Sequence, residues 1–309
     1  MLRRANSALP LPQLSVGEKW RYLWVRVGLV ALLCGVCGGC TNLLLSPSRN
    51  RMKTHGEMET RVSLADGASV QVWTTRSAAA EGHEPKAYVL RFCGNGERAE
   101  DAGWSECQTW EDLPVEIWAM NYPGFGGSSG HGTMSAIPPA ALATYDALRQ
   151  QAGARPVFLS GANIGSAVSL YVATQRPAAG LILRSPPPIK EAVLGTGWWN
   201  LWLVAGPIAV QVPPQLDSIK NARRVTDPAV FVIEGNDHAV SRKYQRLVSA
   251  AYAGEKRVIV NEPTRHNSPA AGAAERKLES DLHWLWSRAM PSTRPATRHH
   301  VPAAPQTHP

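Results

Sequence analysis

Short apolar runs, each bounded by glycine or proline, recur along the middle of the chain. Many of their residues are β-branched or aromatic, which favours strands. The first two runs flank Asp66-Gly67, a dipeptide typical of a hairpin turn. Segments with helical spacing separate most of the later runs. The predicted strands lie at 62–64, 70–74, 87–92, 115–120, 157–160, 181–183, 230–233 and 257–260, and the predicted helices at 98–111, 136–152, 164–176, 241–253 and 269–289.

A hairpin followed by strands that alternate with helices predicts an α/β fold. Strands joined through helices run parallel, so we expect a mostly parallel sheet with helices on both faces. In such a sheet the functional loops lie at the carboxyl ends of the strands. Those loops are therefore where candidate chemistry is sought.

The segment 186–224 breaks this alternation. It contains a strongly apolar stretch, Trp198-Trp199-Asn200-Leu201-Trp202-Leu203, that ends before Gly206-Pro207. A helix packed against the domain is the simpler interpretation. The functional interpretation is a short lid-like insertion over an apolar pocket, or a face that touches lipid.

The N-terminal residues are typical of an export signal. Basic residues up to Arg26 precede a short apolar run, 27–36, and small residues follow. Gly38-Gly39-Cys40 resembles a bacterial lipobox, which predicts a signal peptide over 1–39 and a lipid on Cys40. The alternative is an uncleaved anchor over 27–45, which is barely long enough to span a bilayer. Either way, we expect the chain to be exported and membrane-anchored on the bacterial cell envelope, facing the periplasm or the outside.

The remaining boundaries follow from composition. Residues 40–56 are interpreted as a linker from the membrane anchor, and 57–290 as the α/β domain. The last residues, 291–309, are rich in proline, threonine, histidine and alanine without apolar periodicity, which predicts a disordered tail.

The net charge of +8 lies mainly in the two ends of the chain. Five basic residues and one acidic residue give the leader a charge of +4, and three arginines from Arg288 onward give the tail +3. Removing both leaves +1 for the body. A body so close to neutral implies no basic patch and no nucleic-acid partner.

Two cysteines lie outside the leader, Cys93 and Cys107. Their spacing from the histidines matches no metal site, so we predict neither a metal ion nor a cofactor. Both are interpreted as small buried hydrophobes. Sequence alone leaves open whether they form a disulfide.

Five motifs follow predicted strands: Phe92-Cys93-Gly94-Asn95-Gly96, Asn121-Tyr122-Pro123-Gly124-Phe125, Ser160-Gly161-Ala162-Asn163-Ile164-Gly165, Gly235-Asn236-Asp237 and Thr264-Arg265-His266-Asn267. In this order they resemble the α/β-hydrolase family, in the branch of small exported or membrane-associated serine hydrolases. The resemblance covers roughly residues 57 to 288. It implies a nucleophile on a sharp strand-to-helix turn of the pattern G-x-S-x-G.

The resemblance assigns roles to individual residues. Gly161 and Gly165 occupy the two glycine positions of the turn, and Asn163 stands where the family has its nucleophilic serine. Two further residues, Asn95 and Ile164, would supply the backbone N–H groups of an oxyanion hole. The acid and base would be Asp237 and His266. The chain departs from the family at Cys93, where a histidine is common, and at Asp237, which follows Gly235 by two residues instead of three.

Asn163 changes the expected chemistry. A serine hydroxyl becomes a nucleophile when a base takes its proton, whereas an amide nitrogen has its lone pair delocalised into the carbonyl. Neither Ser160 nor Ser166 can take its place without losing the match to Gly161 and Gly165. We therefore predict a protein without ordinary serine hydrolase activity.

Three functions remain compatible with the sequence. The first is a catalytically silent, membrane-anchored protein that binds an apolar or acyl ligand or a protein. The second is an active hydrolase of esters or amides with a non-standard nucleophile, such as an aspartate formed from Asn163, although bulky Ile164 hinders that deamidation. The third is a structural envelope protein. Reaction with an active-site phosphonate probe favours the second, and pocket occupancy separates the first from the third.

Overall fold

The computed structural model describes residues 17, 45–49, 54, 56–195, 209–237, 239–262 and 270–290. Within them, eight strands form one sheet in the order β1-β2-β4-β3-β5-β6-β7-β8. β2 is antiparallel to both neighbours, and all other pairs are parallel. The strands are β1 Met58–Ser63, β2 Ser69–Arg76, β3 Ala87–Phe92, β4 Val115–Met120, β5 Val157–Ala162, β6 Gly180–Arg184, β7 Ala229–Glu234 and β8 Lys256–Asn261. The predicted mostly parallel sheet is confirmed.

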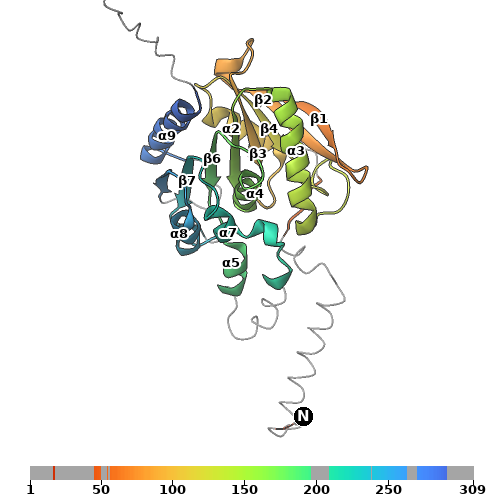
Figure 1. Cartoon of the computed structure of the whole chain (residues 1–309), viewed down its shortest axis with the longest axis vertical. Coiled ribbons are helices and arrows are strands. Elements are labelled where there is room, and N and C mark those ends of the chain that lie inside the picture. The colour runs from red at the N-terminus through yellow and green to blue at the C-terminus, as the bar shows by residue number, and fades with distance from the viewer. Residues whose placement is uncertain are drawn as a thin grey trace, which may run out of the picture.

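Helices cover both faces of this sheet, as predicted (Figure 1). One face packs against α3, α4, α7 and α8, and the other against α2 and α9. The longer helices are α2 Ala99–Thr109, α3 Ile137–Ala152, α4 Ile164–Ala173, α8 Arg242–Ala251 and α9 Ala273–Ala289. The short ones are α5 Ile189–Gly195 and α7 Ser218–Ala222, with 3-10 turns η2 Ala78–Ala80, η3 Met134–Ala136 and η4 Pro214–Leu216.

The hairpin between β1 and β2 forms where Asp66-Gly67 predicts it. Gly67 has a φ of +81°, which glycine adopts without steric cost. The Asp66 carboxylate accepts a hydrogen bond from the Ala68 N–H at 3.0 Å, and the Leu64 N–H donates to the Ala68 carbonyl at 2.8 Å. The turn and its aspartate therefore fix the register of the two strands.

The strands alternate between two apolar cores. Along β3, Tyr88 and Leu90 belong to the core under α3 and α4, whereas Val89 belongs to the core under α2 and α9. Because successive side chains in a strand point to opposite faces, both faces of a central strand must be apolar to be covered. This explains the continuous apolar runs in the sequence.

The structure describes the two cysteines of the domain, but it does not describe the apolar stretch that was interpreted as a lid. Cys93 and Cys107 are buried free thiols, one in each core, so they form no disulfide. The insertion at 186–224 contains α5, η4 and α7, while the Trp198–Gly206 stretch proposed as a lid lies outside the described residues. The predicted signal peptide, apart from residue 17, and the predicted tail 291–309 lie outside them as well.

Candidate active site

The turn between β5 and α4 holds Asn163 in a strained backbone conformation. Its φ is 49° and its ψ is −122°, outside the regions that most residues adopt. Ala162 ends β5 immediately before it, and Ile164 opens α4 immediately after it. A strand that passes into a helix through a single residue presents that side chain at the carboxyl edge of the sheet. Asn163 is half-buried there.

Both glycines that flank the turn are required by close backbone contacts. A Cβ on Gly161 would lie 2.2 Å from the Gly165 carbonyl oxygen. A Cβ on Gly165 would lie 2.1 Å from the carbonyl oxygen of Phe92 and 2.7 Å from that of Cys93. The first turn of α4 is therefore pressed against the end of β3, and only glycine fits at either position.

The two neighbouring serines are occupied by structural hydrogen bonds. The buried Ser166 hydroxyl lies 2.9 Å from the Gly161 carbonyl and 2.8 Å from the Arg184 carbonyl. The buried Ser160 hydroxyl accepts from the Arg184 guanidinium at 2.8 Å. Both hydroxyls serve the backbone or an ion pair, which agrees with the expectation that neither replaces a nucleophile at residue 163.

The two predicted oxyanion-hole residues lie on segments that the structure brings together. Ile164 is the first residue of α4, and its N–H belongs to the first turn of the helix, where backbone donors have no intrahelical acceptor. Asn95 lies in the loop that follows β3, three residues beyond Phe92, the residue that Gly165 contacts. The Asn95 side chain accepts a hydrogen bond from the Ser46 N–H at 2.8 Å. That bond fixes the loop from outside.

The nearby Cys93 is not a substitute nucleophile. Its thiol is buried and donates to the Met120 carbonyl at 3.4 Å. Burial, chiefly, raises the pKa of the Cys93 thiol, with a further contribution from the carboxylate of Glu97. The thiol therefore stays protonated at neutral pH, and the thiolate is the reactive form.

The predicted acid, Asp237, is buried in the loop after β7 and accepts several hydrogen bonds. One carboxylate oxygen accepts from the N–H groups of Ala239 at 2.7 Å and Val240 at 2.9 Å. The other accepts from the Gln245 amide at 3.3 Å. These donors hold the carboxylate at the carboxyl edge of the sheet. The predicted base, His266, lies outside the described residues, as does the predicted lipidation residue, Cys40.

A segment that sequence reasoning treated only as linker packs on the same edge. Leu45 is buried in the core beside α3 and α4. The Ser48 carbonyl accepts from the Gly126 N–H at 2.9 Å. Arg49 donates to the carbonyls of Gly124 at 3.1 Å and Gly130 at 2.9 Å. Together with the bond between Ser46 and Asn95, these contacts attach residues 45–49 to the loops after β3 and β4. The apolar run Leu43-Leu44-Leu45 was the available sequence signal.

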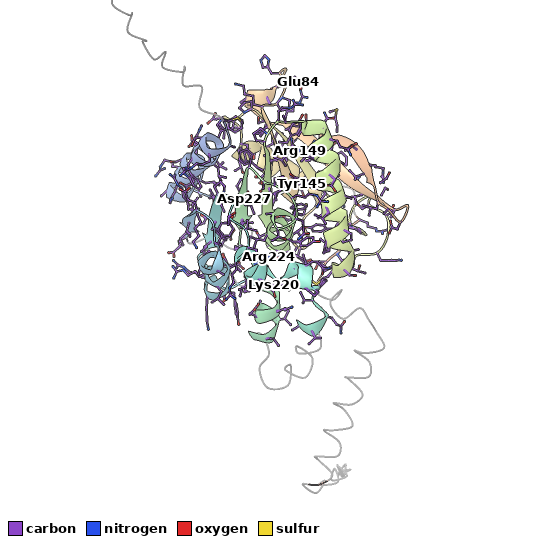
Figure 2. The ribbon with its side chains drawn as sticks, in the orientation of Figure 1. Glu84, Tyr145, Arg149, Lys220, Arg224 and Asp227 are labelled. Atoms are coloured by element: carbon purple, nitrogen blue, oxygen red, sulfur yellow. The ribbon has the colours of Figure 1, made fainter. Side chains whose placement is uncertain are left out.

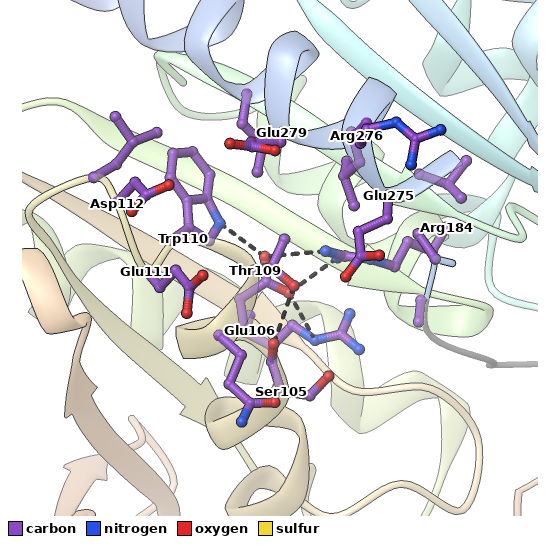
Figure 3. Close-up of a pocket in the computed structure, with 18 of the residues that line it drawn as sticks. Ser105, Glu106, Thr109, Trp110, Glu111, Asp112, Arg184, Glu275, Arg276 and Glu279 are labelled. Carbon is purple, nitrogen blue, oxygen red and sulfur yellow. Dashed lines mark hydrogen bonds and ion pairs between the residues drawn. The ribbon is translucent and has the colours of Figure 1, made fainter. Parts of the chain in front are cut away.

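A buried ion-pair network, also missed by sequence reasoning, lies beneath the turn. The Glu106 carboxylate of α2 lies 2.9 Å from Arg184 at the end of β6 and 3.5 Å from Arg91 of β3. It also accepts from the Trp110 indole at 2.9 Å, and Figure 3 shows these contacts meeting at one carboxylate. The available sequence signal for this network was the presence of Arg91 and Arg184 in otherwise apolar strands. The network matters for the site because the Arg184 carbonyl accepts the Asn163 N–H at 2.9 Å.

The network keeps Glu106 ionised. Burial by itself raises the pKa of a carboxyl group, but the positive charges of Arg184 and Arg91 outweigh it, so the pKa of Glu106 lies below its ordinary value. Burial likewise opposes the charge of Arg91, yet Glu97 and Glu106 raise the pKa of its guanidinium. The three charges line one side of a cavity of about 380 Å³ between α2 and α9.

Three potential metal ligands gather at the rim of that cavity. Donor atoms of Asp112, Glu279 and His283 lie within 4.8 Å of one another, and all three residues are exposed. Figure 3 shows Asp112 on the loop after α2 and Glu279 on α9. Exposed carboxylates commonly gather without an ion. No second feature of the described residues indicates a metal here, so we assign none.

Sequence comparison reaches only uncharacterized proteins. No known family description matches the chain. Two uncharacterized proteins of Mycobacterium tuberculosis, from strains H37Rv and CDC 1551, are each 29% identical to it over 159 residues. The matched region covers 51% of this chain and 55% of each relative. The chain thus spans about half the length of the curated relatives it matches.

Structural comparison finds esterases. Est1E from Butyrivibrio proteoclasticus, solved with ferulic acid, aligns with a TM-score of 0.62 at 15% identity over 74% of this chain and 98% of its own. An esterase of Pyrococcus furiosus aligns with a TM-score of 0.60 at 11% identity, over 80% of this chain and 98% of its own. Acetyl xylan esterase 1 from Thermoanaerobacterium aligns with a TM-score of 0.57 at 11% identity, over 81% of this chain and 92% of its own. At these identities the likeness concerns the fold alone.

Proposed function

From the α/β-hydrolase fold that the chain shares with these esterases, we propose a hydrolase-like protein that lacks ordinary serine hydrolase activity. In this proposal it is held at a membrane by a lipid on Cys40 and binds an apolar or acyl ligand at the carboxyl edge of the sheet. One observation carries the proposal. Asn163 has strained φ and ψ in the single-residue turn between β5 and α4, and we propose that this is the position from which the fold presents its nucleophile.

An asparagine at that position is expected to abolish turnover while leaving the rest of the site able to bind a ligand. Loss of a triad nucleophile removes a factor of about 10⁶ from turnover, while the rest of the site retains roughly 10³–10⁴ over the reaction in water. The backbone donors around Ile164 do not depend on the side chain at 163, so a carbonyl ligand can still be bound. The side-chain amide of Asn163 carries both hydrogen-bond donors and an acceptor, the groups with which asparagine contacts polar ligands.

Two measurements on the unmodified protein test this function. We expect no labelling by a fluorophosphonate probe, and we expect lipid extraction of gently purified protein to release an acyl compound in about equimolar amount. Labelling at residue 163, or ester turnover that disappears in Asn163→Ala, would overturn the loss of activity. Protein that carries no extractable compound and binds no fatty acid in calorimetry would overturn the binding.

The proposed anchor has a separate test. The described residues include no helix that is both long and apolar enough to span a bilayer. We expect mass spectrometry of the mature protein to find Cys40 as the first residue with an acylated thiol, because the basic leader, the apolar run and Gly38-Gly39-Cys40 resemble a lipoprotein signal. Cys40→Ala should then leave the leader uncleaved. A mature chain that begins elsewhere, with Cys40 unmodified, contradicts the anchor.

A further inference from the structure

Helices α7 and α8, with the residues that follow α7, present a group of exposed cations. None of these side chains has an ion-pair or hydrogen-bond partner among the residues that the structure describes. Some other exposed arginines of the domain do pair, as Arg61 does with Glu59 and Arg288 with Glu255, although exposed Arg276 does not. α8 contains no acidic residue at all. The cations are Lys220, Arg223, Arg224, Lys243 and Arg246.

These cations belong to one continuous surface. The ends of α7 and α8 are joined by a hydrogen bond of 3.0 Å from the Ala253 N–H to the Ala222 carbonyl. Tyr244 of α8 lies directly against Gly195, the last residue of α5, where an added Cβ would meet the tyrosine hydroxyl. Lys190 of α5 lies 3.8 Å from Asp217, which caps α7. The three helices therefore share one side of the domain.

Apolar side chains are exposed on the same surface. Leu194 of α5 is 42% exposed and Leu247 of α8 is 41% exposed. Val210, which precedes η4 and α7, is 84% exposed. Cations beside exposed aliphatic side chains are the composition of a surface that enters the interface of an anionic membrane. A nucleic-acid surface would account for the cations but not for these aliphatic side chains.

The attached N-terminal segment places this surface near the predicted anchor. Residues 45–49 bind the loops after β3 and β4, at the carboxyl edge of the sheet. α5 and α8 follow the carboxyl ends of β6 and β7 at that same edge. Only four residues lie between Cys40 and the buried Leu45, so these two residues are at most about 18 Å apart. Figure 1 shows α5 and α7 together at one end of the domain, and Figure 2 shows Lys220 and Arg224 in the same half of the molecule.

We infer that α5, α7 and α8 form a membrane-contact surface that binds anionic phospholipid headgroups and turns the Asn163 edge of the sheet toward the bilayer. The inference rests on the proposed anchor, which brings this surface close to the membrane. It goes beyond the anchor by naming the face that contacts the bilayer, the charge of the lipid that it binds and the orientation of the domain. The sequence analysis did not predict this basic surface, because the body of the chain is close to neutral overall. Carboxylates elsewhere in the body balance the cations of the surface in the net charge.

Lysine footprinting of the full chain in vesicles tests the surface. A water-soluble acylating reagent is applied to protein in phosphatidylcholine vesicles and in vesicles that are one-third phosphatidylglycerol, and acylation of each lysine is read by mass spectrometry. We expect the anionic vesicles to lower the reactivity of Lys220 and Lys243 by about fivefold, the factor that one membrane-bound charge contributes. High salt should restore it. Exposed Lys86, near the opposite end of the sheet beside Glu84, should not change.

Matched charge reversals complete the test. Arg223→Glu with Arg224→Glu should abolish the protection of Lys220 and Lys243, whereas Lys86→Glu with Arg276→Glu, an equal change of charge elsewhere, should preserve it. Equal reactivity of Lys220 and Lys243 in both vesicles, with the chain still vesicle-bound, overturns the surface and leaves the anchor intact. Protection by duplex DNA but not by anionic vesicles also overturns it. Fluorophosphonate labelling of the unmodified chain bears only on the proposed loss of hydrolysis.

Discussion

The substitution Asn163→Ser is expected to convert an unreactive protein into one that a fluorophosphonate probe labels and that hydrolyses a short-chain activated ester. In our proposal, the backbone that a nucleophile needs is already present. The turn has its strained φ and ψ, and Gly161 and Gly165 allow the close approach of α4 to β3. Serine is smaller than asparagine, so it meets no steric obstacle. Since the nucleophile accounts for a factor of about 10⁶, even a small part of that factor is measurable.

The control for this prediction is the predicted base. His266→Ala in the Asn163→Ser background should remove the gain, because the serine hydroxyl needs a proton acceptor. Asparagine tolerates positive φ better than serine, so we also expect the variant to lose about 1 kcal/mol of folding free energy, measured by thermal unfolding. A well-folded Asn163→Ser protein that neither reacts nor turns over would mean that the remaining site has lost hydrolase geometry. A gain that persists without His266 would assign the base elsewhere.

Much of the fold could be predicted because its signals are local. The runs 87–92 and 115–120 coincide with β3 and β4, since glycine and proline or charged loops bound each apolar stretch. Helix ends were less well placed. The helix predicted at 164–176 ends at Ala173, and the one predicted at 98–111 spans Ala99–Thr109. Ends fray and depend on capping contacts, which periodicity does not report.

The features that sequence could not supply depend on contacts between distant residues. The strand order, with β4 between β2 and β3, follows from packing of the whole sheet. The attachment of residues 45–49 requires the loops around Asn95 and Gly124, far along the chain. Residue spacing located Asn163 and Asp237 at strand ends because strand ends carry glycine signals. Residue spacing did not indicate that Glu106, in a predicted helix, contacts two arginines from separate strands.

Removal of the Glu106 carboxylate should destabilise the domain strongly. In Glu106→Ala, Arg184 and Arg91 lose the buried anion that both contact, and breaking a buried ion pair from one side costs about 3–5 kcal/mol. For a domain of this size that corresponds to a fall in Tm of about 6–20 °C, measured by calorimetry. Arg91 retains Glu97 at 3.1 Å, so Arg184 should account for most of the loss.

Acid pH and a matched variant show whether the charge of Glu106 is responsible. Because its folded pKa is depressed, its stabilising contribution is complete above about pH 4.3, the ordinary value for glutamate, and is lost as pH falls toward the folded pKa. The stability difference between the unmodified protein and Glu106→Ala should therefore be constant near neutrality and shrink on acidification below that value. The exposed neighbour Glu111→Ala should change stability by no more than about 0.5 kcal/mol at any pH. A loss under about 1 kcal/mol in Glu106→Ala, or a loss independent of acid pH, would show that the carboxylate is not what fixes Arg184 beneath Asn163.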